Sequence, residues 1–213
     1  MYATREAAGE VLAEALARLD LSDPVVLALP RGGVPVALPV ARALSAPLDL
    51  ILVRKIGLPR QPELAAGALV EGPPEHIVWN EHVLRGTGLA PADLEATVER
   101  ERATNAARRG KWLKGHDPVD VAGRSAVVVD DGIATGATMK AAITGLRARG
   151  PREIVLAVPV AAADTLEEMR ALVDRVVCPL VPEHFRAVGL YYRDFGQVAD
   201  EAVAAIMAAQ GKE

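Results

Sequence analysis

Short apolar runs alternate with longer amphipathic segments along most of the chain. Apolar runs bounded by glycine, proline or charged residues are typical of strands buried on both faces. We predict five such strands, at residues 25–29, 48–53, 126–129, 154–160 and 175–181. The segments around them predict helices at residues 4–19, 34–44, 137–149 and 165–172.

This alternation predicts an α/β fold with a largely parallel sheet. In such sheets, ligands bind beyond the carboxyl ends of the strands, where the strand order reverses. Two segments depart from the alternation. Residues 65–70 and 76–79 flank a turn at 71–75, which indicates a strand–turn–strand excursion, and residues 91–114 predict a polar helix with a thin apolar stripe. A helix this polar is expected to pack weakly and to act as a mobile cover.

Composition narrows the class of protein. The 213 residues suit one domain, and an apolar content of 51% is enough for a sizeable core. The net charge of −4 argues against broad binding to nucleic acid or to anionic membranes. Cys178 is the single cysteine, and neither a signal peptide nor an apolar run of ~20 residues is visible, so we expect a cytoplasmic protein.

The most informative stretch follows the predicted strand at 126–129. Asp130 and Asp131 come first, and a short turn with Gly132 and Gly136 then opens a helix. The N–H groups at a helix start are unpaired and lie at the positive end of the dipole, so they favour a phosphate. Carboxylates repel phosphate but accept hydrogen bonds from a ribose diol. The stretch therefore predicts a site for ribose 5-phosphate.

Other phosphate-binding loops fit these residues less well. A nucleoside triphosphate loop has four residues between its glycines and then Gly-Lys-Ser/Thr. Here only three residues separate Gly132 from Gly136, and Ala137 stands in the place of the lysine. The dinucleotide-binding Gly-x-Gly-x-x-Gly is absent too. The assembled pattern favours a ribose-phosphate site over a simple turn with solvated acids.

Residues 127–138 resemble the ribose-phosphate loop of type I phosphoribosyltransferases, which has apolar residues, two acids, a short spacer and Thr-Gly-x-Thr. The resemblance implies that Asp130 and Asp131 are catalytic residues that hold the ribose hydroxyls. It assigns the 5-phosphate to Ala134, Thr135, Gly136, Ala137 and Thr138. It also implies a three-layer α/β/α fold with a five-stranded core sheet. The single domain would span residues 1–213, with a flexible loop or lid at 71–122 and a C-terminal hood or tail at 182–213.

Two further strand ends carry glycines and basic residues. Arg31-Gly32-Gly33 follows the first strand, where the family has a pyrophosphate-binding loop, often with unusual peptide geometry. Arg54-Lys55 ends the second strand, where adenine and orotate phosphoribosyltransferases have a basic residue that contacts pyrophosphate. The resemblance therefore assigns the pyrophosphate to Arg31, Gly32, Gly33, Arg54 and Lys55.

Residues 185–195 gather aromatic and arginine side chains near the end of the chain. They loosely resemble the base-recognition region of hypoxanthine-type enzymes, in which an aromatic ring stacks on the purine and a nearby acid contacts it. On that resemblance, Phe185 or Tyr191 would stack and Asp194 would accept from ring N–H groups. The alternative is a small hydrophobic cluster that docks the C-terminal tail.

Four motifs together make the chain resemble a bacterial family of predicted phosphoribosyltransferases; they lie at residues 29–36, 53–57, 130–138 and 192–195. The resemblance implies a Mg²⁺-dependent glycosyltransferase of nucleotide metabolism, which binds 5-phosphoribosyl-1-pyrophosphate (PRPP) and transfers ribose 5-phosphate to a nucleobase-like nitrogen acceptor. The substrate would hold most of the Mg²⁺ coordination, with Asp130 and Asp131 reached through water. Dimers are common in this fold. A non-catalytic regulator that binds PRPP, and hydrolysis or phosphate transfer on another sugar phosphate, remain alternatives.

Overall fold

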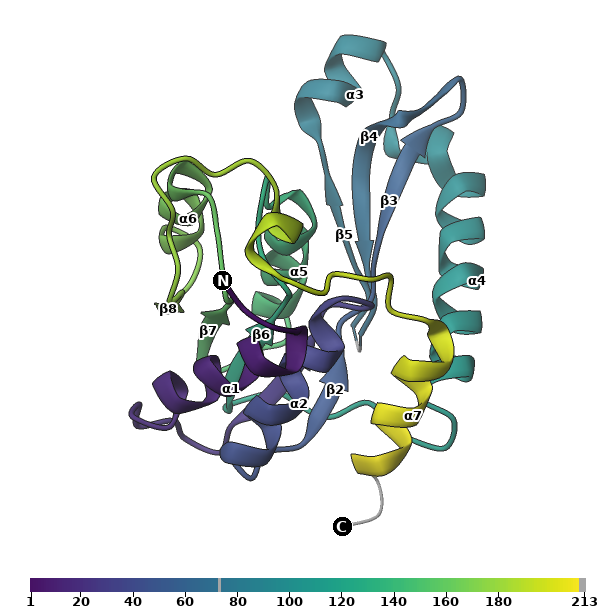
Figure 1. Cartoon of the computed structure of the whole chain (residues 1–213). Coiled ribbons are helices and arrows are strands. Elements are labelled where there is room, and N and C mark those ends of the chain that lie inside the picture. The colour runs from purple at the N-terminus through teal and green to yellow at the C-terminus, as the bar shows by residue number, and fades with distance from the viewer. Residues whose placement is uncertain (73, 211–213) are drawn as a thin grey trace.

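The computed structural model of the protein describes residues 1–72 and 74–210 (Figure 1). The elements, in chain order, are α1 (Arg5–Leu16), β1 (Val25–Ala28), α2 (Gly33–Ala43), β2 (Leu48–Leu50), β3 (Val53–Leu58), β4 (Gln61–Val70), β5 (His76–Trp79), α3 (Glu81–Thr87), η1 (Pro91–Leu94), α4 (Glu95–Trp112), β6 (Ser125–Val129), α5 (Ala137–Arg147), β7 (Glu153–Ala157), α6 (Ala163–Arg170), β8 (Arg175–Val177), η2 (Val188–Tyr191) and α7 (Asp200–Gln210). The expected turn at 71–75 and tail at 182–213 include Pro73 and residues 211–213, which lie outside the described residues. None of the described helices is both long enough and apolar enough to cross a membrane.

Five parallel strands form the larger sheet, in the order β2-β1-β6-β7-β8. All five begin within two residues of an apolar run that predicted them. The strand order reverses between β1 and β6, because β1 leads to β2 on one side and β6 leads to β7 and β8 on the other. A reversal of this kind opens a crevice at the carboxyl ends of the two central strands. The segments that follow β1 and β6 therefore lie next to each other.

The two faces of this sheet enter two separate cores. Neighbouring residues of a strand point to opposite faces. Val26 of β1 and Val127 of β6 pack with α1, α2 and α7, whereas Leu27 and Val128 pack with α5 and α6. All four valine and leucine side chains are fully buried. The result is the three-layer α/β/α arrangement that the sequence predicts (Figure 1).

A second sheet, β3-β4-β5, is antiparallel and extends away from the larger one (Figure 1). The predicted strand–turn–strand excursion is confirmed as β4 and β5. The separate strand β3 was not predicted, because the apolar run at 48–53 gives no sign that the chain leaves one sheet at Leu50 and enters another at Val53. Ile56, Leu69 and Leu94 bury a small core of their own beside this sheet.

Helix α4 packs more firmly than its polar sequence predicts. Val98, Asn105 and Trp112 are each less than a tenth exposed. They recur two helical turns apart and only Thr97 is buried beside them, so the stripe is narrow and easily overlooked in a sequence. An ion pair between Arg109 and Asp49 of β2, with 3.5 Å between nitrogen and oxygen, fixes the helix to the larger sheet. Closure of residues 71–122 over a ligand stays a prediction.

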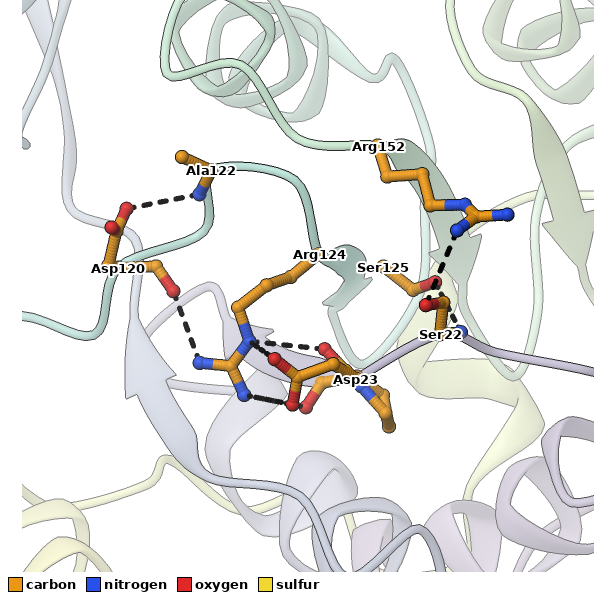
Figure 2. A network of polar contacts seen from close by, with 8 residues as sticks. Ser22, Asp23, Asp120, Ala122, Arg124, Ser125 and Arg152 are labelled. Carbon is orange, nitrogen blue, oxygen red and sulfur yellow. Dashed lines mark hydrogen bonds and ion pairs between the residues drawn. The ribbon is translucent and has the colours of Figure 1, made fainter.

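The amino edge of the larger sheet is closed by polar contacts (Figure 2). Arg124, just before β6, donates to the backbone carbonyl of Asp23 at 3.1 Å and pairs with its carboxylate at 2.8 Å. Ser125 accepts a hydrogen bond from the backbone N–H of Ser22 at 2.9 Å. These contacts join the starts of β1 and β6, so they stabilise the edge opposite the candidate site.

Candidate active site

The loop after β6 brings two carboxyl groups to the carboxyl edge of the sheet. β6 is buried throughout, whereas the side chains of Asp130 and Asp131 that follow it are half-buried. Gly136 has the left-handed φ of 70°, which an L side chain rarely adopts, and precedes the first residue of α5. The N–H groups of the first turn of α5 therefore begin at the same edge as the acids.

One hydroxyl group beside this loop supports its backbone, and two on the loop and the start of α5 are accessible. Thr165 of α6 donates to the backbone carbonyl of Ala134 at 2.6 Å, which fixes the middle of the loop. Thr135 and Thr138 are exposed. The predicted 5-phosphate residues thus form a braced turn with two accessible hydroxyl groups at the start of a helix.

The loop after β1 touches both acids through its glycines. A β-carbon on Gly32 would lie 2.1 Å from Oδ2 of Asp131, and one on Gly33 would lie 2.9 Å from Cα of Asp130. Only glycine fits at either position without displacing the acidic loop. The peptide bond between Pro30 and Arg31 is cis. The structure therefore brings together two loops that lie about a hundred residues apart in the sequence.

Two residues that sequence reasoning missed hold Asp131 in place. Arg5 of α1 donates from Nε to Oδ2 of Asp131 at 2.8 Å, and its guanidinium lies 3.9 Å from the centre of the Phe195 ring. The hydroxyl of Tyr192 donates to the backbone carbonyl of Asp131 at 2.6 Å. Tyr192 belongs to one of the motifs that carry the family resemblance, but no pattern in the sequence pointed to Arg5.

The two acids differ in their surroundings. Burial, together with the negative charge of Asp131, raises the pKa of Asp130 well above its usual range. Burial also raises the pKa of Asp131, but the hydrogen bond and charge of Arg5 oppose that rise. Asp130 is therefore the acid that takes up a proton more readily, and Arg5 favours the ionised form of Asp131.

Of the predicted pyrophosphate residues, Arg54 and Lys55 line cavities, and each of the three cations has a carboxylate partner. Arg54 pairs with Glu101 at 2.8 Å, Lys55 with Glu63 at 3.0 Å, and Arg31 with Asp200 at 3.6 Å between nitrogen and oxygen. Lys55 lines a cavity of about 440 Å³ together with Arg54, and a second one of about 280 Å³ together with Ala137 and Thr138. Sequence reasoning did not foresee these pairs, because Glu101 and Asp200 lie far along the chain and Glu63 lies on the neighbouring strand β4.

The aromatic segment lies against the acidic loop. A β-carbon on Gly132 would lie 2.6 Å from Cγ1 of Val188, so η2 covers this turn. Phe185 and Tyr191 stack on each other, with 5.7 Å between ring centres. The carboxylate of Asp194 accepts from the N–H of Gly196 at 3.1 Å. The segment does form a hydrophobic cluster with Ala8 and Val160, and its role toward a base stays a prediction.

Two other kinds of site were considered at the sequence level: a reactive cysteine and a cluster of metal-binding side chains. Burial raises the pKa of the Cys178 thiol to about 11, so it stays protonated at neutral pH and unreactive. Within residues 1–72 and 74–210, no group of three or more His, Cys, Asp or Glu side chains is arranged to hold a metal ion.

A doubly wound parallel sheet, a glycine loop after its first strand and paired acids before a helix at the strand-order reversal together define the type I phosphoribosyltransferase fold. The family model for the phosphoribosyl transferase domain matches residues 2–195, and the chain belongs to that family.

Relatives with known names agree with this assignment. A protein of Mycobacterium tuberculosis strain H37Rv, "Putative phosphoribosyl transferase Rv0571c", is 47% identical over 208 residues, and its counterpart in strain CDC 1551 matches equally. The match covers 97% of this chain and 46% of the relative, so the chain spans about half the length of the curated relatives it matches. The crystal structure of TT1426 from Thermus thermophilus superposes with a TM-score of 0.85 at 45% identity, over 98% of both chains.

Proposed function

We propose that this chain binds PRPP and transfers its ribose 5-phosphate to a nitrogen acceptor, with release of pyrophosphate. One observation carries the proposal. Two half-buried acids end the central strand β6 within a few residues of the helix start at Ala137, and the glycine loop after β1 packs directly on them. Acids for a diol, N–H groups for a phosphate and a basic loop for a pyrophosphate match the three parts of PRPP.

In the proposed complex, the carboxylates of Asp130 and Asp131 accept hydrogen bonds from the ribose hydroxyls. The N–H groups of residues 134–138 and the hydroxyls of Thr135 and Thr138 bind the 5-phosphate. Arg5 already holds the Asp131 carboxylate at 2.8 Å, so this acid is oriented before the sugar arrives. Orientation of this kind is the main contribution that a protein makes to a reaction needing no covalent intermediate.

The reaction exchanges one bond at the anomeric carbon. The bond from ribose C1 to the pyrophosphate oxygen breaks as a bond from C1 to the acceptor nitrogen forms, and that nitrogen loses a proton. Negative charge develops on the departing pyrophosphate. Arg31, Arg54 and Lys55 would stabilise this charge once they separate from Asp200, Glu101 and Glu63.

The side chains at this site would hold Mg²⁺ only together with the substrate. A hard cation takes oxygen ligands, and Asp130 and Asp131 offer two carboxyl groups, which leaves most of the coordination to substrate and water. When bound, the ion would neutralise charge on the pyrophosphate. We therefore propose Mg²⁺ dependence, with the metal held mainly by PRPP.

The acceptor is proposed to bind beside the aromatic segment. Val188 lies on the turn at Gly132, and Tyr192 contacts the backbone of Asp131, so this segment borders the proposed ribose site. The outer faces of Phe185 or Tyr191 would stack on a nucleobase, and Asp194 would accept from its ring N–H groups.

A thermal-shift titration with PRPP and Mg²⁺ tests binding, and pyrophosphate release with a panel of nucleobases tests transfer. PRPP at ~100 times its dissociation constant should add about 2.7 kcal/mol to the free energy of unfolding. We expect Asp131→Asn to lower turnover by orders of magnitude while the protein stays folded. An Asp131→Asn variant with full activity would refute the assignment. Binding of PRPP without pyrophosphate release on any acceptor would instead identify a regulator that senses PRPP.

A further inference from the structure

The guanidinium group of Arg5, the first residue of α1, contacts two other segments of the chain. Its Nε donates to Oδ2 of Asp131, and its Nη1 donates to the backbone carbonyl of Gly196, both at 2.8 Å. Its face lies on the ring of Phe195, with 3.9 Å between Cζ and the ring centre. The Arg5 side chain is 11% exposed, so solvent screens its charge only weakly. Arg5 thus joins the acidic loop to the end of the aromatic segment.

The two carboxylate oxygens of Asp131 have different surroundings. Oδ2 accepts from Arg5, and a β-carbon on Gly32 would lie 2.1 Å from it, so protein encloses this oxygen. Among residues 1–72 and 74–210, the hydrogen bonds to the Asp131 side chain end on Oδ2 alone. Each oxygen of an ionised carboxylate can accept about two hydrogen bonds, so Oδ1 keeps its capacity for the hydroxyl of a ligand.

Arg5 also fixes the orientation of the acid it compensates. In the part of the chain that the structure describes, it is the only cation that forms an ion pair with Asp130 or Asp131. Gly32 and Tyr192 pack against Asp131 without contributing a charge. A carboxylate without a fixed partner would rotate about its side-chain bonds and would lose that freedom when a ligand binds. The ion pair removes this cost before the ligand arrives.

We infer that Arg5 is a positioning residue of the proposed transferase: it holds Asp131 through Oδ2, leaves Oδ1 to accept from a ribose hydroxyl, and ties this acid to the aromatic segment beside which the acceptor would bind. The inference rests on the proposed function and extends it to a residue outside the phosphate-binding loops. Because Phe195 and Gly196 hold the same guanidinium, displacement of the aromatic segment would also loosen Asp131. The sugar and acceptor sides of the site are thereby coupled.

Calorimetric titration with ribose 5-phosphate, and separately with 2,3-dideoxyribose 5-phosphate, tests the inference. The second sugar lacks both hydroxyls of the diol. Arg5→Met removes the charge and the donors but keeps most of the length of the side chain on Phe195. We expect affinity for ribose 5-phosphate to fall by about tenfold or more, because a hydrogen bond to a charged acceptor is lost with the orientation of Asp131. Affinity for the dideoxy sugar should stay unchanged, since the start of α5 binds its phosphate.

The matched control for net charge is Arg18→Met, which removes an exposed positive charge just beyond the end of α1. Both affinities should stay at the wild-type level in this variant. Arg5→Lys keeps the charge but replaces the planar fork by a single ammonium group, so its preference for ribose 5-phosphate should lie between those of the wild type and Arg5→Met. Should Arg5→Met melt below the assay temperature, Arg5→Gln takes its place with the same expected result.

A wild-type preference for ribose 5-phosphate in Arg5→Met overturns the inference, as does an equal loss of affinity for the two sugars. The second result would mean that Arg5 only stabilises the fold or attracts anions. A wild-type protein that binds neither PRPP nor ribose 5-phosphate, or that does not distinguish the two sugars, would refute the proposed function itself. The two failures are therefore distinguishable.

Discussion

At the scale of single residues, Asp130 and Asp131 are neighbours in the chain with unlike surroundings. Arg5 pairs with Asp131 at 2.8 Å, whereas no cation of the described residues forms an ion pair with Asp130. Two adjacent carboxylates in a half-buried site repel each other, and only one of them is compensated. The pair therefore lowers the stability of the folded protein, as expected for groups that the proposed function assigns to a ligand.

Replacing Asp130 by Asn should therefore stabilise the ligand-free protein at neutral pH. The raised pKa of Asp130 means that the folded state binds its proton more tightly than the unfolded state does. The destabilising effect of the carboxylate is thus absent below the unfolded pKa, grows as pH rises and is complete above the folded pKa. Melting temperatures measured from about pH 4 to about pH 8 should show an advantage for Asp130→Asn that increases with pH. A variant that melts below the wild type at neutral pH would contradict this account.

Gly32→Ala should damage the site by contact alone. The φ of Gly32 is −61°, which alanine adopts easily, but its β-carbon would lie 2.1 Å from Oδ2 of Asp131. Asp131 must then move away from Arg5, so PRPP affinity should fall, and overpacking should cost about 1–3 kcal/mol of stability. Gly110→Ala is the matched control, because its β-carbon would meet nothing within 4 Å in α4, and it should be neutral or slightly stabilising. Equal effects of the two substitutions on PRPP binding would rule out the contact.

At the scale of elements, α4 shows how a few buried residues and ion pairs hold a polar helix in place. Its buried positions recur two turns apart, which gives little amphipathic signal, and its fixation depends on partners in β2 and α7. The expectation of a mobile cover came from the sequence of the helix alone. The structure instead packs it along β3, beside the loop after β1 and the start of α5.

Leu94→Ala tests how firmly the start of α4 is packed. Leu94 is fully buried against Ile56 and Leu69, so truncation should lower the free energy of unfolding by about 2–5 kcal/mol. Leu64→Ala removes the same atoms from a side chain that is 40% exposed and should change stability by about 0.5 kcal/mol or less. Urea unfolding measures both. A Leu94→Ala cost no larger than that of Leu64→Ala would show that α4 spends much of its time detached.

At the scale of the whole molecule, the N-terminal segment meets residues 191–193 beside the acidic loop. The N–H of Tyr2 donates to the carbonyl of Tyr191 at 2.8 Å, and the N–H of Arg193 donates to the carbonyl of Tyr2 at 2.9 Å. The rings of Tyr2 and Tyr192 lie 5.6 Å apart. The N-terminal segment thus supports Tyr192 and supplies Arg5, both of which contact Asp131.

Tyr2→Ala should consequently weaken a site that it does not touch. Loss of the ring removes packing from Tyr192, so we expect stability to fall by about 1–3 kcal/mol and PRPP affinity to fall with it. Tyr2→Phe removes only the hydroxyl, which donates to the carbonyl of Pro159 at 2.9 Å, and should cost about 1 kcal/mol with PRPP affinity retained. Chemical denaturation and calorimetry measure the two quantities. Undiminished PRPP affinity in Tyr2→Ala would show that the terminal crossing is irrelevant to the site.

The layers were expected from the family resemblance of the motifs. The amino-acid sequence alone determined the five core strands and the two loops that follow β1 and β6. It could do so because each of these features is local. A run of apolar residues indicates a buried strand, and glycines and acids directly after it indicate a candidate ligand-binding turn. β3 was not predicted because the single apolar run at 48–53 contains β2 of one sheet and the start of β3 of the other. Only the tertiary structure decided which distant side chains contact the acidic loop, namely Arg5 and Tyr192 on Asp131. These contacts join residues far apart in the chain, and nothing in a local pattern records where a long side chain from another element will reach.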